Sequence, residues 1–130
     1  MSEPVKRRRV LVVDDEALLR SAIRRNLQAS CDVFLAATPE EALGILTTQE
    51  CDVVISDVSI PPSMMHGPEF LRQVQALYPN VIRLIMSGND GEEAQEAVTA
   101  GVAEAFLAKP LNLDELEALL ARVRARLASS

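Results

Sequence analysis

The sequence predicts a single α/β domain built on a parallel sheet with helices on both of its faces. Five short apolar runs of strand length alternate with stretches in which apolar residues recur at helical spacing. Four of the five runs end in a polar or charged residue, which is where an open parallel sheet places its binding groups. This alternation implies right-handed crossovers between parallel strands, and therefore a doubly wound, five-stranded fold with five helices.

Size and composition limit the chain to one folded unit. It has 130 residues, of which 48% are hydrophobic, enough for one core. No apolar run approaches the ~18 residues needed to span a bilayer, and the four apolar residues 10–13 are too few for a signal peptide. Cys31 and Cys51 are too few for a disulfide framework and fit no zinc pattern. We expect a cytoplasmic protein with reduced thiols and no membrane contact.

The charge is unevenly distributed along the chain. The net charge is -6, yet residues 1–9 carry four basic and one acidic side chain. We expect a basic, disordered tail over residues 1–8 and one domain over residues 9–128. Because the body is acidic, no direct nucleic-acid binding by this domain is expected.

The first half of the chain supplies three strands and two helices. The strands are predicted at residues 10–13, 33–36 and 51–57. The first helix, over about residues 16–28, has an apolar set of Leu18, Leu19, Ala22, Ile23 and Leu27. The second helix begins at Thr38-Pro39, where Thr38 can cap and Glu41 can complete a capping box, and it ends at about Thr48.

The second half supplies two strands and three helices. The strands are predicted at residues 81–86 and 105–108. A helix over residues 68–77 begins at Pro68, and its buried side is expected to be Phe70, Leu71, Val74 and Leu77. A helix over about residues 92–100, capped by Asp90 with Glu93, has the apolar face Ala94, Ala97 and Val98. The last helix, capped by Asn112 and Glu115, has the apolar stripe Leu116, Leu119, Leu120, Val123 and Leu127. The alanine face buries little area, so the 92–100 helix should be the least firmly held.

Asp57 is the first candidate for chemistry because it ends the buried strand of residues 51–57. In a parallel sheet, the other polar strand ends lie along the same edge: Asp14, Asp15, Ser87 and Lys109. Taken alone, Asp57 could simply open the next loop or cap a helix. The convergence of all five residues favours a functional site instead.

This set of residues suits phosphoryl transfer to a carboxylate. Three carboxylates drawn together repel one another unless a cation intervenes, and a hard cation such as Mg²⁺ takes oxygen ligands. Asp14 and Asp15 can hold the metal while Asp57 supplies one ligand oxygen and attacks phosphorus with the other. Lys109 and Ser87 would stabilise the charge on the transferring oxygens.

The chain resembles the receiver domain of bacterial two-component response regulators, of which the chemotaxis regulators are examples. The matching elements are Val12-Val13-Asp14-Asp15-Glu16, the strand that ends at Asp57 with Pro61 four residues on, Ser87-Gly88, Phe106, and Lys109-Pro110 before a last amphipathic helix. The resemblance covers almost the whole chain. It implies a flavodoxin-like fold with strand order 2-1-3-4-5 and a cis Lys109-Pro110 bond.

The resemblance also implies a role for each matching residue. Asp57 would be the phosphoacceptor. Asp15 would bind Mg²⁺ directly and Asp14 partly through water, with Mn²⁺ as an alternative ion, and the backbone carbonyl of Ser59 would be a further ligand. Lys109 would pair with the acceptor, Ser87 would be the switch hydroxyl and Phe106 the switch aromatic. Side chains at Ser59 and Asn89 would gate the water that hydrolyses the acyl phosphate.

The expected partners follow from that role. The phosphoryl donor would be a sensor histidine kinase or a histidine phosphotransfer protein. An output domain or protein would bind the 92–100 helix, the fifth strand and the last helix, and a homodimer that forms on phosphorylation is left open. One stretch departs from the family pattern: the usual glycine falls about two residues before Gly67, so Ser63-Met64-Met65-His66 resembles a small insertion. His66, the only histidine, is taken as a solvated loop residue.

Two rival functions remain beside the phosphorylation switch. A docking module of the same fold could work without phosphorylation, but it would have no need of mutually repelling carboxylates. A Mg²⁺-dependent phosphohydrolase would be expected to show an Asp-x-Asp motif and a cap domain, neither of which is present. No Walker-type glycine-rich loop is present, which removes a nucleotide-hydrolysing function.

Overall fold

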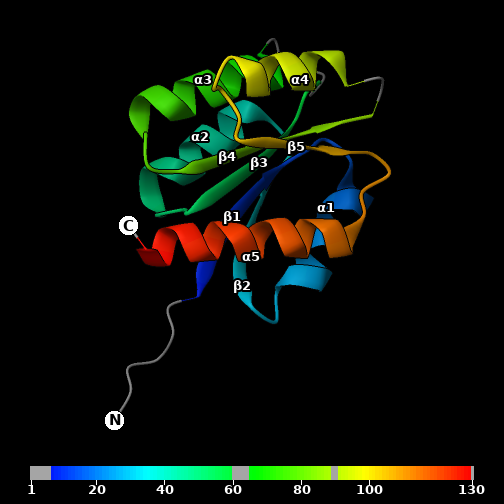
Figure 1. Ribbon diagram of the computed structural model, residues 1–130, viewed down its shortest axis with the longest axis vertical. Coiled ribbons are helices and arrows are strands. Elements are labelled where there is room, and N and C mark those ends of the chain that lie inside the picture. Colours follow the sequence, from blue (N-terminus) through cyan, green and yellow to red (C-terminus); the bar gives the residue numbers. More distant parts are fainter. Residues whose placement is uncertain (1–6, 60–64, 89–90, 130) are drawn as a thin grey trace.

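The structure is a computed structural model that describes residues 7–59, 65–88 and 91–129. Within these residues, five strands and five helices alternate along the chain (Figure 1). The strands are β1 (Arg8–Val13), β2 (Cys31–Ala36), β3 (Val53–Asp57), β4 (Ile82–Ser87) and β5 (Ala105–Ala108). The helices are α1 (Ala17–Leu27), α2 (Pro39–Thr48), α3 (Gly67–Leu77), α4 (Glu92–Thr99) and α5 (Leu113–Ser129). The predicted alternation is confirmed.

The strands form one parallel sheet in the order β2-β1-β3-β4-β5, which confirms the order implied by the family resemblance. The register aligns the strand ends, because Val13 pairs with Ser56 and Asp57 pairs with Met86. At the next pair along, Ser87 lies opposite Ala108. The carboxyl ends of four strands therefore meet along one edge.

Helices cover both faces of the sheet and create two apolar layers. In Figure 1, α1 and α5 lie on one face and α2, α3 and α4 on the other. Leu11 and Val13 of β1 pack toward the second group, whereas Val10 and Val12 pack toward α1 and α5. Each fully buried aliphatic side chain stabilises the fold by about 1.5–3 kcal/mol. No helix in the described part of the chain is long and apolar enough to cross a membrane.

Side-chain caps set the start of two helices as predicted. The Thr38 hydroxyl accepts a hydrogen bond from the backbone N–H of Glu41 at 3.1 Å, and the Asn112 side chain accepts one from Glu115 at 3.1 Å. The predicted Asp90 cap of α4 is wrong, since the N-cap residue is Gly91, with φ of 81° and no side-chain bond. Glycine adopts this left-handed conformation without steric cost. Asp90 itself lies outside the described residues.

The predicted tail of residues 1–8 is wrong at its C-terminal boundary, because the fold already includes Arg7 and Arg8. The Arg7 guanidinium donates to the carboxylate of Asp32 at 2.8 Å and to the carbonyl of Cys31 at 2.8 Å. Arg8 begins β1 and donates to the carbonyl of Leu120 at 2.9 Å. Two basic side chains are thus used as hydrogen-bond donors to the folded body, while residues 1–6 lie outside the described residues.

Two leucines assigned to buried helix faces are exposed. Leu18 of α1 is 81% exposed and Leu77 of α3 is 62% exposed. The face of α1 that meets the sheet is centred on Ile23 and Leu27. Leu18 lies five residues before Ile23, and at about 3.6 residues per turn this spacing places it on another side of the helix. Leu77 is the last residue of α3, where the next residue, Tyr78, packs against the core instead. The side chains of Val123 and Leu127 lie outside the described ones.

Candidate functional site

The polar strand ends converge as predicted. Asp57 is the last residue of β3 and Ser87 the last residue of β4, while Asp14 directly follows β1 and Lys109 directly follows β5. The parallel register carries all four to the same edge of the sheet. Residues up to 95 positions apart in sequence thus make direct contact there.

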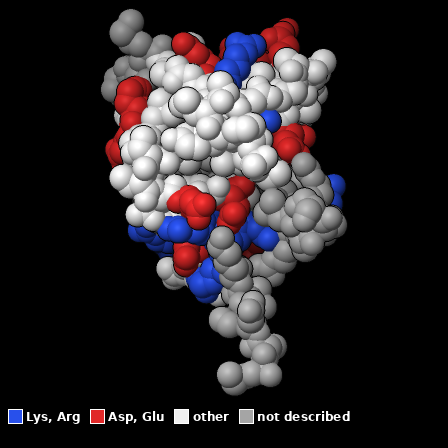
Figure 2. All heavy atoms as spheres, turned by 90° about the vertical axis from the view of Figure 1, so that its left-hand side faces the viewer, with Lys and Arg blue, Asp and Glu red and all other residues white. Residues whose placement is uncertain are grey.

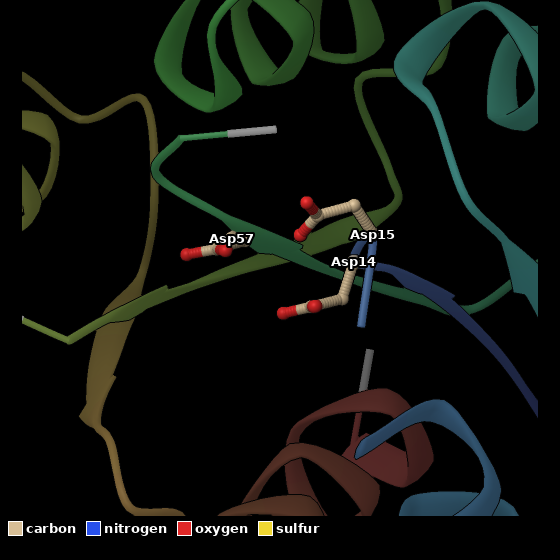
Figure 3. Close-up of side chains that lie close together, drawn as sticks. All are labelled: Asp14, Asp15 and Asp57. Carbon is tan, nitrogen blue, oxygen red and sulfur yellow. The ribbon is translucent and has the colours of Figure 1, made fainter. Parts of the chain in front are cut away.

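Three carboxylates form the centre of the site. Asp14, Asp15 and Asp57 each present an oxygen, and these oxygens lie within 4.8 Å of one another. Figure 3 shows the three side chains projecting to the same side from the ends of β1 and β3. Asp14 is fully buried and Asp57 is 9% exposed, whereas Asp15 is open to solvent. The acid cluster is therefore buried at Asp14 and accessible to solvent at Asp15.

Lys109 joins two of the acids. Its Nζ atom lies 2.7 Å from Oδ2 of Asp14 and 3.1 Å from Oδ2 of Asp57. Its backbone N–H donates to the carbonyl of Ser87 at 2.8 Å, and its stem lies against Gly88. The Lys109-Pro110 peptide bond is cis, as the resemblance implied. One ammonium thus faces three carboxylates, which leaves an excess of negative charge.

Burial and charge shift the proton affinities of this pair. Burial raises the pKa of the Asp57 carboxyl above its usual range; Lys109 opposes the shift without cancelling it, and Asp14 adds to it. Burial alone would lower the pKa of Lys109, but its hydrogen bonds to Asp14 and Asp57 outweigh that effect and the pKa is raised. Lys109 therefore stays charged, and any further cation nearby would stabilise the ionised form of Asp57.

Arg20 forms a contact that no sequence pattern indicated. Its Nη1 atom donates a hydrogen bond of 2.8 Å to the backbone carbonyl of Asp14, at the turn from β1 into α1. The carboxylate of Asp14 supports the same turn by accepting the backbone N–H of Glu16 at 2.8 Å. Basic residues on an amphipathic helix are usually solvated, so spacing alone could not single out Arg20.

Gly67 is a second position that sequence patterns missed. The helix α3 begins at Gly67, one residue before the predicted start, and its N–H donates to the carbonyl of Val58 at 2.8 Å. A Cβ atom built at Gly67 would lie 1.9 Å from the backbone oxygen of Asp57. Only a glycine permits this approach of α3 to the end of β3. The offset of this glycine from the family pattern hinted at altered loop geometry, not at this contact.

The remaining predicted residues lie around the acids. Ser87 is buried, and Phe106 is half-buried with its ring edge 3.5 Å from where a Cβ on Gly91 would be. Ser59 is exposed. His66 is the exposed N-cap residue of α3 and forms no side-chain cap bond. Asn89 and residues 63–64 of the predicted insertion lie outside the described residues.

A hollow of about 480 Å³ lies at the opposite edge of the sheet and contains none of these residues. Leu46, Cys51, Tyr78 and Val81 are among its lining residues. Figure 2 looks onto the left-hand side of Figure 1, where a broad area carries no charged side chain. Burial raises the pKa of the Cys51 thiol to about 11, so the thiol stays protonated and is a poor nucleophile. Chemistry is therefore expected at the acidic edge.

The donor set fits a hard divalent cation. Carboxylate oxygens are the ligands that Mg²⁺ and Mn²⁺ prefer, and no cysteine or histidine belongs to the cluster. The partial exposure of the cluster leaves room for the waters that Mg²⁺ retains. The charge excess left by Lys109 would be offset by such an ion.

Comparison with known proteins agrees with this geometry. The family profile of the response regulator receiver domain matches residues 10–121. The chain belongs to this family. MprA, a response regulator of Mycolicibacterium vanbaalenii, is 34% identical over 120 residues. These residues make up 92% of this chain and 50% of MprA. HoxA, a hydrogenase transcriptional regulatory protein of Cupriavidus necator, is 34% identical over 116 residues, or 85% of this chain and 23% of HoxA. The chain thus spans half or less of the length of these relatives.

Solved receiver structures have the same fold. The chemotaxis response regulator CheY4 of Vibrio cholerae is 33% identical, with a TM-score of 0.80 over 91% of this chain and 99% of CheY4. The signal receiver domain of an HD domain-containing protein from Pseudomonas fluorescens is 25% identical, with a TM-score of 0.88 over 96% of this chain and all of that one. This chain is therefore a receiver domain of the two-component type.

Proposed function

We propose that this receiver domain accepts a phosphoryl group on Asp57 from the phosphohistidine of a sensor histidine kinase or a histidine phosphotransfer protein. The observation that carries the proposal is the place of Asp57, at the carboxyl edge of the sheet, 3.1 Å from Lys109 and within the acid cluster. Phosphoryl transfer needs a nucleophilic oxygen beside groups that neutralise the charge of the phosphoryl oxygens. This edge supplies both.

Mg²⁺, or Mn²⁺ in its place, would be held by Asp14, Asp15 and Asp57, with the backbone carbonyl of Ser59 as a further ligand. When bound, the ion supplies positive charge against the phosphoryl oxygens. The excess of three carboxylates over one ammonium supports this assignment. Asp14 is already held by Lys109 and the Glu16 N–H, so it is poised to face the ion without rearranging.

The transfer itself is a substitution at phosphorus. An oxygen of Asp57 forms a bond to phosphorus while the phosphorus–nitrogen bond of the donor histidine breaks, and the electron pair leaves with the imidazole. Lys109 stays charged and stabilises the phosphoryl oxygens, together with the Ser87 hydroxyl. The domain would catalyse only its own phosphorylation and dephosphorylation, and so is a signalling phosphoacceptor rather than an enzyme acting on a separate substrate. Side chains at Ser59 and Asn89 would set the rate of hydrolysis.

Phosphorylation would then alter a binding surface. The new negative charge draws the Ser87 hydroxyl toward the phosphoryl group, and Phe106 turns into the space left behind. Phe106 already packs against the core layer under α4, which supports coupling between the site and that helix. The output partner would bind α4, β5 and α5. Free thiols at Cys31 and Cys51 are in keeping with a cytoplasmic location.

Phosphorylation of Asp57 is tested by mass spectrometry after incubation with Mg²⁺ and a small phosphodonor. The wild type is expected to gain one phosphoryl group, and a chelator should prevent the gain. Asp57→Asn should gain none, whereas the matched variant Asp52→Asn, at the opposite end of β3, should behave like the wild type. Labelling of Asp57→Asn at the wild-type level would overturn the proposal.

The switch is tested by hydrogen exchange with and without the phosphodonor. Changes are expected to concentrate between Ser87 and Ala108, because the switch residues and α4 lie there. Changes confined to α1 would show that the signal leaves by another face. If phosphorylated and unmodified protein exchange alike throughout, the alternative of a docking module that ignores phosphorylation is favoured.

A further inference from the structure

Arg20 fixes the backbone on one side of Asp15. The side chain of this α1 residue reaches back to the end of β1, where Nη1 donates to the backbone carbonyl of Asp14 at 2.8 Å. That carbonyl belongs to the peptide unit that joins Asp14 to Asp15, and peptide units are planar. The hydrogen bond therefore fixes the direction in which the chain enters Asp15.

Asp14 fixes the backbone on the other side of Asp15. Its Oδ1 atom accepts the N–H of Glu16 at 2.8 Å, and this N–H belongs to the peptide unit that leaves Asp15. The Asp15 carboxylate is exposed and forms no hydrogen bond with the part of the chain that the structure describes. Its position is thus set by its backbone, and the backbone is held from both sides.

The buried carboxylate of Asp14 does not depend on Arg20. Its Oδ2 atom lies 2.7 Å from Nζ of Lys109, and the backbone N–H of Asp14 donates to the carbonyl of Ala36 at 3.1 Å. Loss of the Arg20 side chain would leave these bonds in place. The loss therefore affects Asp15, whose backbone would then be held only on one side, by the bond from the Glu16 N–H to Asp14.

We propose that Arg20 is a positioning residue for the divalent cation: by holding the Asp14 carbonyl, it keeps the Asp15 carboxylate beside those of Asp14 and Asp57. The inference rests on the proposed function, since it assumes that the acid cluster binds the ion. Arg20 acts through the backbone and does not touch the ion. Loss of a group that orients a metal ligand typically lowers metal affinity about 10–100-fold.

Electrostatics alone predicts the opposite sign. Arg20 is a positive charge near a cation site, so removing it would tighten binding of the ion if charge repulsion were its main effect. A positioning role predicts weaker binding when Arg20 is removed. The direction of the change in Mg²⁺ affinity therefore decides between the two.

The test measures Mg²⁺ affinity by calorimetry and Mn²⁺ affinity by electron paramagnetic resonance, on the whole chain without phosphodonor. Arg20→Met keeps the apolar stem and removes the donor, and we expect it to weaken binding about tenfold. Arg20→Lys, which keeps a charge and a donor, should restore affinity to within about threefold of the wild type. In phosphorylation assays, Arg20→Met should raise the Mg²⁺ concentration for half-maximal rate and leave the rate at saturating Mg²⁺ nearly unchanged.

Arg24→Met is the matched control. Arg24 lies one turn along α1 and also donates to a backbone carbonyl, that of Val33 at 3.1 Å, away from the acids. The control loses the same charge and the same kind of bond, and it should bind Mg²⁺ like the wild type. If Arg20→Met does not fold, Arg20→Gln takes its place and should weaken binding at least threefold, which is a loss of about 0.7 kcal/mol.

Two results would overturn the positioning role. One is an affinity of the neutral Arg20 variant equal to or higher than that of the wild type, and the other is an equal loss in Arg24→Met. If the wild type itself binds no divalent ion, the proposed function fails and this inference fails with it. Wild-type binding that Arg20→Met leaves unchanged would remove the inference alone.

Discussion

At the scale of single residues, the site contains more negative than positive charge. Asp14, Asp15 and Asp57 supply three carboxylates and Lys109 supplies one ammonium. In metal-free protein Lys109 offsets part of the repulsion by bridging Asp14 and Asp57. A bound cation would relieve the repulsion that remains. Burial is the main cause of the raised pKa of Asp57, and Asp14 adds to it. The excess of negative charge accounts for the expected need for Mg²⁺.

Gly67 provides a residue-scale prediction, because a side chain there must displace the backbone of Asp57. The Cβ atom of Gly67→Ala would lie 1.9 Å from the oxygen and 2.9 Å from the carbonyl carbon of Asp57. We expect a loss of stability of about 1–3 kcal/mol in urea unfolding, the usual cost of overpacking, and slower labelling of Asp57.

Gly44→Ala is the matched control for this prediction. Gly44 lies within α2, and nothing lies within 4 Å of its added Cβ atom. Alanine is favoured over glycine inside a helix, so this variant should gain about 0.5–1 kcal/mol and label normally. Equal stability and labelling rates in the two variants would contradict the close approach of α3 to Asp57.

At the scale of elements, α3 and α4 differ in how firmly they are held. The helix α3 buries Phe70, Leu71 and Val74 completely, whereas α4 buries Ala94 and Ala97 and begins at a glycine cap. Each methylene buried is worth about 0.8 kcal/mol, so α4 has much less packing to lose when it opens. The sequence predicted this difference from the alanine face alone.

Native-state hydrogen exchange should therefore separate the two helices. Amides in the middle of α4 are expected to exchange at least about tenfold faster than those in the middle of α3, corresponding to an opening free energy lower by about 1.4 kcal/mol or more. The measurement is amide exchange by NMR on unphosphorylated protein. Equal protection in the two helices would show that α4 is held by contacts other than its alanines.

At the scale of the whole molecule, the site affects the stability of the fold through proton and metal binding. Because burial raises the pKa of Asp57, the native state holds that proton more tightly than the unfolded chain does. The stability contributed by Asp57 is therefore lost as pH rises from the usual aspartate pKa of about 3.9 through the raised value. At neutral pH, without metal, the fold therefore bears the free-energy cost of keeping the buried Asp57 carboxylate ionised.

Asp57→Asn should remove that cost. We expect the variant to be about 1 kcal/mol more stable than metal-free wild type at neutral pH, with the gain shrinking as the pH falls toward the usual aspartate value. Mg²⁺ should reduce or reverse the gain, since an ion present at ten times its Kd stabilises the wild type by about 1.4 kcal/mol. Urea unfolding at several pH values measures this. A loss of stability in metal-free Asp57→Asn at neutral pH would contradict the charge balance described for the site.

The sequence by itself determined the fold class, the strands and helices to within a few residues, and the edge on which Asp14, Asp57, Ser87 and Lys109 meet. It could do so because hydrophobic periodicity and the parallel-sheet rule act on local patterns and on strand direction, both of which are written along the chain. The family resemblance added the strand order and the cis Lys109-Pro110 bond, and the structure confirms both.

Only the tertiary structure decided which groups touch. The bond from Arg20 to the Asp14 carbonyl, the approach of Gly67 to Asp57 and the inclusion of Arg7 in the fold each depend on how one segment packs on another. The exposure of Leu18 and Leu77 has the same origin, because helical spacing shows which residues share a face but not where that face stops meeting the sheet. Such contacts depend on how closely one segment packs against another, to within a few ångströms, which no local pattern specifies.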